Sequence, residues 1–419
     1  MTDVADEELT EVTVDELSSS LRGFYVPEFQ VLVEGAGLPD NVMRDVLEVT
    51  YEDDLEKMDS FQITVSNWDE VVHDYKYLGA DQDLGEAADG SDSTDLVTMF
   101  EPCGKKVTLK MGYSGDLKTM IKGYFTTLEP TFGGSTATTL TVRGINALQR
   151  LRTKKYSDFF QHMKPSAIAI DVGRRPDREL NALRLPIHID TKPGIQAGER
   201  NIDFLAQKNE YSIDFLWKLA RQEGYVLSYF EQQGDTPARL YFGPSDSRDS
   251  MSQSIYNLKL GQSLIDFKPR ITTANQFKSV TVNGWNRRTQ RAISETVSFD
   301  DAEMQRLNAD LRYMICMCDA REELVVDRPV FTEADAHNQA KALLLDQHKQ
   351  MVTVSGTTIG LPLLKSGRKV RISDVGVRLS GDYFITKTQH IFNSNGYITK
   401  FDGRREHVPD NPPRSGASS

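Results

Sequence analysis

Short runs in which apolar and polar residues alternate dominate this chain of 419 residues. A period of two places every second side chain on one face, which is typical of a strand with one buried face. Between Phe29 and Val142 the pattern predicts six such strands, separated by glycine and polar turns. The alternating positions are Phe29–Val33, Leu47–Tyr51, Phe61–Val65, Val107–Met111, Ile121–Phe125 and Leu140–Val142. The series predicts a small β-barrel or sandwich whose other face meets water or a partner.

A short repeat suggests that this β-unit occurs twice. The segment Thr141-Val142-Arg143-Gly144-Ile145-Asn146 returns 140 residues later as Thr281-Val282-Asn283-Gly284-Trp285-Asn286, and Thr353-Val354-Ser355-Gly356 is a shorter echo. Each apolar run meets a glycine, so we expect sharp turns at Gly144, Gly284 and Gly356. A repeat spaced by a domain length predicts two copies of one β-module. Chance recurrence is the alternative, because only four positions are fixed.

The middle of the chain predicts a linking α+β unit. Ser212 is a good helix N-cap, and Gly224 is a plausible stop twelve residues later. Strands are expected at Tyr225–Phe230 and Arg239–Phe242, and an extended connection is expected from Asp171 to Asp203.

The C-terminal part predicts strands that are interrupted by two helices. One helix is expected from Asp301 to about Leu311. The other has Thr332 as N-cap and Asp335 at its third position. The strands are expected around Tyr256, Leu264–Phe267, Val280–Trp285, Val352–Val354, Val370–Ile372, Tyr383–Ile385, Ile391 and Tyr397–Phe401.

These patterns predict an α+β, β-rich fold with two β-modules, each a small barrel or sandwich, and a linking domain. Residues 1–22 form an acidic flexible tail, and 23–152 form the first barrel, with an acidic insertion at 68–95. Residues 153–255 link to a second barrel at 256–408, and 409–419 form a loose tail.

The bulk composition excludes several classes of protein. The net charge of −12 argues against nucleic acid as the main partner, because phosphate binding needs a basic surface. No apolar run approaches the roughly 20 residues of a membrane helix, and the N-terminus lacks a secretion signal. We therefore expect synthesis in a cytoplasm and no membrane insertion. The three cysteines give no disulfide framework.

No motif in the sequence indicates a catalytic, cofactor-binding or metal-binding residue. Cys316 and Cys318 lack the second pair that zinc needs. Asp81, Asp83 and Asp89 resemble a calcium loop, but Glu86 and Asp92 stand where glycine and glutamate are required. The seven histidines have no metal-site spacing, and His390 is predicted to be a strand residue bonded to backbone. Carboxylates distant in sequence can still converge, so glycosidase chemistry stays open.

Taken in order, several segments resemble the late control gene D family, the central hub proteins of contractile phage tails and related injection systems. The resemblance covers about residues 24–405. The segments that carry it are Pro27–Val33, Asp45–Val49, Met58–Val65, Gly112-Tyr113, Gly123, Leu140–Gly144, Tyr211–Leu216, Leu219-Ala220, Glu223–Tyr225, Val280–Asn286, Gly367, Val370, Ile372, Ser380–Ile385, His390 and Gly396–Phe401.

The resemblance implies a homotrimer in which each chain carries two tube-like antiparallel barrels, so that six barrels form a pseudo-six-fold ring. Such a hub joins a three-fold spike to a six-fold inner tube, contacts baseplate wedge proteins and has no enzymatic activity or cofactor. The insertion 68–95 is longer than the family pattern, and no spike module is fused to the chain, so a separate spike protein is expected. Two other classes remain as alternatives. One is a tail-associated cell-wall or glycan-active protein, and the other is a receptor-binding module with exposed aromatic residues.

Overall fold

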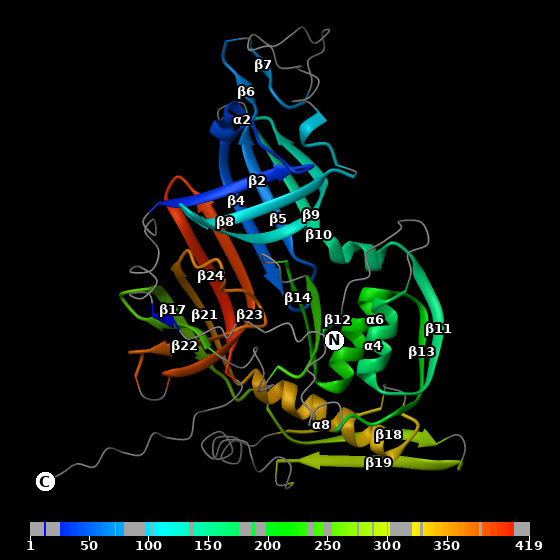
Figure 1. Cartoon of the computed structure of the whole chain (residues 1–419). Helices are drawn as coiled ribbons and strands as arrows, with labels where there is room; N and C mark the ends of the chain where they lie inside the picture. Colours follow the sequence, from blue (N-terminus) through cyan, green and yellow to red (C-terminus); the bar gives the residue numbers. More distant parts are fainter. Residues whose placement is uncertain are drawn as a thin grey trace, which may run out of the picture.

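Two β-modules share one large sheet in the computed structural model of the chain (Figure 1). The structure describes residues 12–13, 26–71, 73–78, 98–102, 104–133, 138–175, 187–188, 198–232, 238–245, 254–274, 276–286, 289–299, 301, 321–326, 330–376 and 379–405. The calcium-like aspartates, all three cysteines and residues 302–311 of one expected helix lie outside these ranges.

The first module contains the strands expected from the alternation. Its strands are β2 (Pro27–Val33), β4 (Val46–Asp54), β5 (Ser60–Ser66), β8 (Lys106–Tyr113), β9 (Asp116–Thr131) and β10 (Thr139–Asn146). Every second residue of β5 is buried, and Phe61, Ile63 and Val65 face the core. A short strand β3 (Ala36–Gly37) and helix α2 (Asp40–Asp45) connect β2 to β4. In the expected insertion, β6 (Trp68–Asp69) pairs with β7 (Asp74–Tyr75).

The second module has its own apolar core. Its strands are β16 (Ser254–Lys259), β17 (Leu264–Ile271), β21 (Val352–Ile359), β22 (Lys369–Ser373), β23 (Gly381–Asn393) and β24 (Gly396–Arg404). Tyr383–Ile385 and Ile391, expected on separate strands, lie on the single strand β23. Strand β1 (Val12–Thr13) pairs with β16, so two residues of the expected flexible tail are part of the sheet.

The linking unit lies beside both modules (Figure 1). Its elements are η1 (Ala147–Arg152), β11 (Lys155–Met163), α4 (Pro165–Gly173), β12 (Ile187–His188), β13 (Ile202–Tyr211), α6 (Ser212–Glu223), β14 (Val226–Phe230) and β15 (Arg239–Gly243). The Ser212 prediction was wrong in its role, because the helix already includes this buried residue and Tyr211 is the cap. Gly224 ends α6 in the left-handed region, as predicted (φ 70°).

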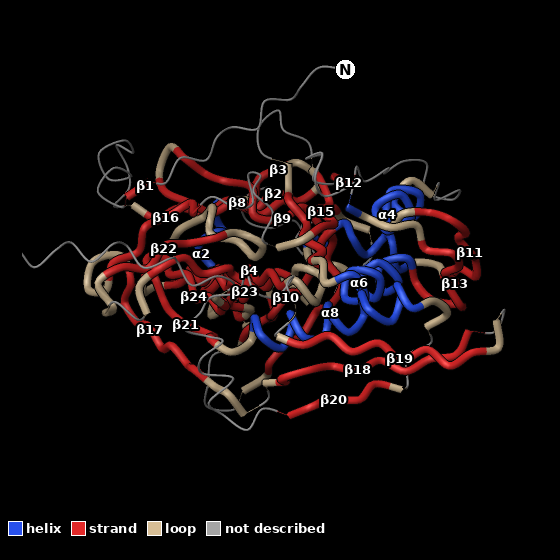
Figure 2. Tube along the Cα trace, turned by 90° about the horizontal axis from the view of Figure 1, so that it is seen from below, coloured by secondary structure: helices blue, strands red, loops and turns tan. Residues whose placement is uncertain are grey.

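A separate three-stranded sheet is inserted between β17 and β21. It consists of β18 (Phe277–Asn286), β19 (Arg291–Ser298) and β20 (Arg321–Val325), and helix α8 (Glu333–Lys349) packs on it (Figure 2). Buried Val280, Val282 and Ile293 share one core with Ala340 and Leu344. The cap of α8 is confirmed, since the Thr332 side chain accepts a hydrogen bond from the Asp335 amide at 3.1 Å.

The sequence repeat does not mark the duplicated unit. Thr141–Asn146 lies on β10 between β5 and β9, whereas Thr281–Asn286 lies on β18 between β19 and β20 in the inserted sheet. The two segments therefore occupy unrelated positions, and their similarity reflects only the shared demands of a strand with one buried face. The duplication itself is visible in the strand order.

Candidate functional site

The two modules repeat the same strand order. The first follows β4-β5-β10-β9-β8-β2, and the second follows β17-β21-β24-β23-β22-β16. The order along the chain is the same as well. Strands β2, β4, β5, β8, β9 and β10 of the first module therefore correspond, in that order, to β16, β17, β21, β22, β23 and β24 of the second. The outermost pair differs, because β2 and β8 are antiparallel whereas β16 and β22 are parallel. The other pairs in both paths are antiparallel, so each strand of one module has a counterpart in the other.

Irregularities of the sheet recur at matching positions. The register shifts at Leu47 in β4 and at Ile265 in β17. It shifts again at Thr126, where β9 meets β10, and at Thr386, where β23 meets β24. A bulge adds one residue to one strand and fixes the local twist and register. Because both bulges are duplicated, the residues of one module can be aligned with those of the other.

A glycine stands opposite the second bulge in each module. A Cβ on Gly144 would lie 2.5 Å from the Tyr124 carbonyl oxygen, and one on Gly403 would lie 3.0 Å from the Phe384 carbonyl oxygen. The prediction of a turn at Gly144 was wrong, because this residue lies inside β10 and is required by close approach of a neighbour. Gly284 and Gly356 likewise lie inside β18 and β21 rather than in turns.

The modules are joined edge to edge. Strand β23 pairs with β22 through residues 381–384 and then, on the same edge, with β4 through residues 387–393. This joint contains seven residue pairs, from Lys387↔Asp54 to Asn393↔Glu48. Lys387 also forms an ion pair with Glu52. The joint extends the sheet from β17 at one end, through β21, β24, β23, β4, β5 and β10, to β9 at the other (Figure 1).

Asp53 fixes the joint from inside. Its Oδ1 accepts hydrogen bonds from the Ser366 amide at 2.8 Å and the Thr388 hydroxyl at 3.1 Å, and its Oδ2 accepts one from Tyr51 at 3.4 Å. Burial raises the pKa of Asp53, while the Lys365 ammonium and the bonds from Ser366 and Thr388 act in the opposite direction. The carboxyl group therefore connects β4 to two segments of the second module.

More carboxyl groups than cations are buried near the joint. Burial raises the pKa of Asp59 well above its usual value, and the Asp53 charge adds to this shift. Burial also raises the pKa of Glu231 and lowers the pKa of Lys365, against the pull of Asp53. The Lys365 ammonium donates to the carbonyl oxygens of Met120 at 2.9 Å and Thr119 at 3.3 Å. The cluster connects both modules with the linking unit.

His390 lies in the same interior and is bonded to backbone, as predicted. Its Nε2 lies 2.9 Å from the Leu364 carbonyl oxygen, and its Nδ1 lies 2.9 Å from the Tyr397 hydroxyl. Burial lowers its pKa to about 3, with a contribution from the Lys365 charge. The ring is therefore neutral at physiological pH and holds β23 against the loop that carries Lys365.

The two ends of this sheet are open. Strand β17 pairs with β21 alone among the strands that the structure describes. The last residues of β9, from Thr127 to Thr131, pair with β10 and have no described neighbour on their other edge. In the bulge alignment, β17 corresponds to β4, and the end of β9 corresponds to the part of β23 that pairs with β4. The open ends are thus the counterparts of the two edges that form the internal joint.

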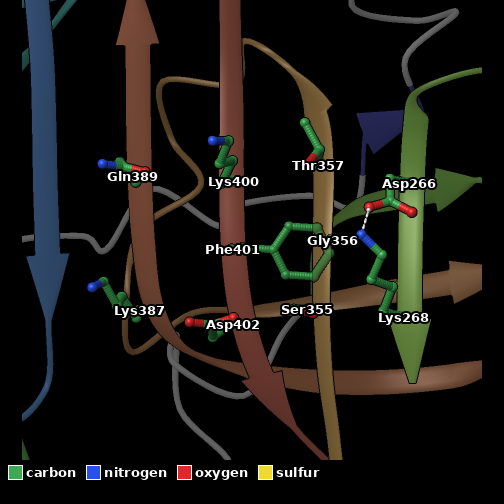
Figure 3. Close-up of a pocket in the computed structure, with 10 residues that line it drawn as sticks. All are labelled: Asp266, Lys268, Ser355, Gly356, Thr357, Lys387, Gln389, Lys400, Phe401 and Asp402. Carbon is green, nitrogen blue, oxygen red and sulfur yellow. Dashed lines mark ion pairs between the residues drawn. The ribbon is translucent and has the colours of Figure 1, made fainter. Parts of the chain in front are cut away.

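The solvent-facing side of this sheet is polar. A depression of about 320 Å³ lies over β17, β21, β24 and β23, lined by residues that include Lys268, Lys387, Lys400 and Asp402 (Figure 3). Asp266 pairs with Lys268 at 2.7 Å. Alternating charges make the surface hydrophilic without a single dominant sign. Such a surface suits contact with water rather than burial against an apolar partner.

Among the residues that the structure describes, histidine, cysteine, aspartate and glutamate side chains form no group of three or more placed to hold a metal ion. In the same ranges no helix combines the length and apolar character needed to cross a bilayer. The convergence of Asp53, Asp59 and Glu231 was not predicted, because nothing local in the sequence signals it.

Solved structures of tail proteins share this fold. The 43 kDa tail protein of prophage MuSo2 from Shewanella oneidensis is 15% identical with a TM-score of 0.60, covering 91% of this chain and 98% of that chain. A tail protein from Neisseria meningitidis MC58 is 14% identical with a TM-score of 0.58, covering 91% and 97%. An E. coli component of the type VI secretion system is 12% identical with a TM-score of 0.50, covering 91% and 79%.

The same β-rich architecture is therefore shared with phage tail proteins and a secretion-system component. A search of curated proteins gave no match. Residues 25–394 match the family model described as the Alg8 N-terminal domain, so the match includes the first module, the linking unit and the second module except β24. The chain belongs to the Alg8 N-terminal domain family.

Proposed function

We propose that this chain is the structural hub of a baseplate in a phage tail or contractile injection particle. One observation carries the proposal: the chain contains two modules of equal strand order, joined edge to edge, with the corresponding edges open at both ends. An interface between unlike edges joins copies head to tail and closes a ring when the rotation permits. Three copies then present six similar modules, which matches a three-fold partner on one side and a six-fold partner on the other.

The partners proposed here are supported by the repeated modules of the chain and by the resemblance to the late control gene D family. The hub binds two further copies of itself, a spike protein on a separate chain, inner-tube or tube-initiator proteins, and wedge proteins. It is made in the bacterial cytoplasm and built into the particle. Nucleic acid is not among its partners, since the chain carries a net charge of −12.

The hub has no enzymatic activity of its own in this proposal. A glycosidase needs two carboxyl groups that flank an accessible substrate. Asp53, Asp59 and Glu231 do converge, but they are only 3%, 6% and 6% exposed. Asp53 is further occupied by the bonds that hold the modules together. This arrangement favours a structural role for the cluster over the glycan-active alternative.

Light scattering coupled to size-exclusion chromatography tests the proposal. The purified full chain at high concentration should contain a trimer, and electron microscopy should show a ring with six similar lobes. A chain that stays monomeric at every concentration and hydrolyses cell-wall glycans would contradict the proposal and support the enzyme. Hydrolysis should be absent in wild-type protein and unchanged in Asp53→Asn.

A further inference from the structure

We infer that the end of β9 in one protomer pairs antiparallel with β17 of the next, in a register fixed by the internal joint. This inference rests on the proposed trimer and specifies which edges close it. Between β17 and β9 all seven strand pairs are antiparallel. Strand β9 therefore runs opposite to β17, and a second copy can continue the same alternation across the gap.

The two bulges supply the register. Residues of the two modules are matched by counting from the bulge in each strand. Thr126 corresponds to Thr386, so two residues later Leu128 corresponds to Thr388, and Glu129 then corresponds to Gln389. Because Ile265 corresponds to Leu47, Arg270 corresponds to Glu52 and Ile271 to Asp53. The internal joint pairs Thr388 with Asp53 and Gln389 with Glu52. Transfer of these pairs places Leu128 opposite Ile271 and Glu129 opposite Arg270 of the next copy.

The residues that meet in this register are complementary. Leu128 and Ile271 are both apolar, and Ile271 is 39% exposed at the position where its counterpart Asp53 is 3% exposed. Glu129 and Arg270 have opposite charges and both are exposed in the single chain. Opposite charges and apolar side chains directly across an antiparallel pair stabilise a sheet. A second copy thus covers apolar surface and pairs charge at adjacent positions.

Phe132 extends the match beyond the end of β9. It corresponds to Phe392, whose ring meets Phe29 across the internal joint at a centroid distance of 4.7 Å. Phe132 is 60% exposed, although Tyr75 holds it in an edge-on contact at 5.3 Å. In the transferred register Phe132 stands opposite Phe267 of the next copy. The exposed ring is therefore in place to contact a neighbouring module as Phe392 does.

We call the inferred pairing of β9 with β17 of the next protomer the seam. Two prolines distinguish the seam from the internal joint. Pro130 and Pro269 correspond to His390 and Tyr51 and stand opposite each other. The Leu55 amide donates to the Thr386 carbonyl oxygen at 3.2 Å, so alternate pairs along this joint, including Tyr51↔His390, share backbone bonds. Proline cannot donate such a bond, and it is tolerated where its nitrogen faces an open edge. The seam therefore has fewer backbone bonds than the joint and depends more on its side chains.

Disulfide trapping tests the register on the full chain. Thr131 and Lys268 are opposite each other, on exposed positions where backbone bonds are absent and Cα atoms lie about 4.5 Å apart. The double variant Thr131→Cys, Lys268→Cys should oxidise to covalent dimers and trimers, within the reach of a disulfide. The control Thr127→Cys, Lys268→Cys displaces the pair by four residues, or roughly 13 Å, and should cross-link at least tenfold less. Each single variant controls for the native cysteines.

The outcomes separate the seam from the proposed function. Strong trapping of the first pair and weak trapping of the control support the register. A wild-type trimer in which the control pair cross-links as well as the first pair, or in which neither does, overturns the register and leaves the hub proposal standing. A wild-type chain that is monomeric at every concentration, with no trapping of either pair, overturns both.

Discussion

Gly144 shows how one residue can decide whether two strands meet. A Cβ at this position would lie 2.3 Å from the Phe61 ring and 2.5 Å from the Tyr124 carbonyl oxygen. The backbone oxygen cannot move without disturbing β9. At Gly403, the matching position of the second module, a Cβ would have the Phe384 carbonyl oxygen as its closest neighbour at 3.0 Å, so a glycine recurs where the bulge brings a backbone oxygen close.

Gly144→Ala should destabilise the fold by about 1–3 kcal/mol, the usual effect of forcing an extra methyl into a packed interior. Urea denaturation followed by circular dichroism measures this loss. The matched control is Gly37→Ala, where a new Cβ meets nothing within 4 Å. Equal stability of the two variants would show that the close approach at Gly144 is relieved at little cost.

Asp59 makes stability depend on pH. Burial raises the pKa of its carboxyl group, so the folded chain holds a proton that the unfolded chain releases near pH 4. The stability from this group is complete below about pH 4 and is lost as pH rises through the folded pKa.

Asp59→Asn removes that titration and retains an oxygen that can accept from Asn146. Its free energy of unfolding should decline less than that of wild type between pH 5 and pH 8. Urea denaturation at several pH values checks this. Asp40→Asn makes the same change at an exposed position and serves as the control for the substitution itself. Parallel curves for wild type and Asp59→Asn would contradict the prediction.

At the scale of elements, helix α8 depends on its cap. Thr332 satisfies the Asp335 amide, and Glu333 and Asp335 place negative charge in the first turn. Thr332→Ala should lower stability by about 1 kcal/mol. Thermal unfolding monitored by circular dichroism measures the change. Ser294→Ala, at an exposed position of β19, is the control and should be close to neutral. A similar effect of both changes would exclude capping as the reason.

Local patterns revealed most of the strands and failed where a bulge changed the phase. In β23 the buried residues switch from Tyr383 and Ile385 to Thr388 and His390 on crossing Thr386. A strict period of two therefore predicts two strands instead of one.

Helix α4 was missed for a different reason. It is buried on most sides, including Ile168, Ala169 and Val172, so the sequence has no polar stripe.

The candidate site was beyond reach of the sequence. The internal joint pairs residues such as Asp53 and Thr388, which are 335 positions apart, and no local pattern encodes their register. Pro130 and Pro269 are the available signals, since proline within a strand indicates an edge. The apparent repeat misled because four fixed positions are too few to locate a duplication that only the strand order preserves.

For the whole molecule, the proposed seam predicts how association responds to charge. Arg270→Glu replaces an opposite-charge pair with a like-charge pair at each of three seams. Because such a pair contributes roughly 0.2–1 kcal/mol at each of the three seams, the association constant of the trimer should fall roughly 3- to 150-fold. Analytical ultracentrifugation over a concentration series measures it. Arg321→Glu, an exposed position on β20, makes the same charge change away from the seam and should leave association unchanged.

Strand β23 has a mechanical consequence. It pairs with β22 in its own module and then with β4 in the other module. A force applied along β23 is therefore transmitted to β4 as shear, parallel to the strands. Seven residue pairs then resist sliding together instead of parting one at a time, as they would if the strands were peeled from one end. Within each chain, the two modules should therefore resist tension as a single body, and in the proposed trimer separation should begin at the seam between chains.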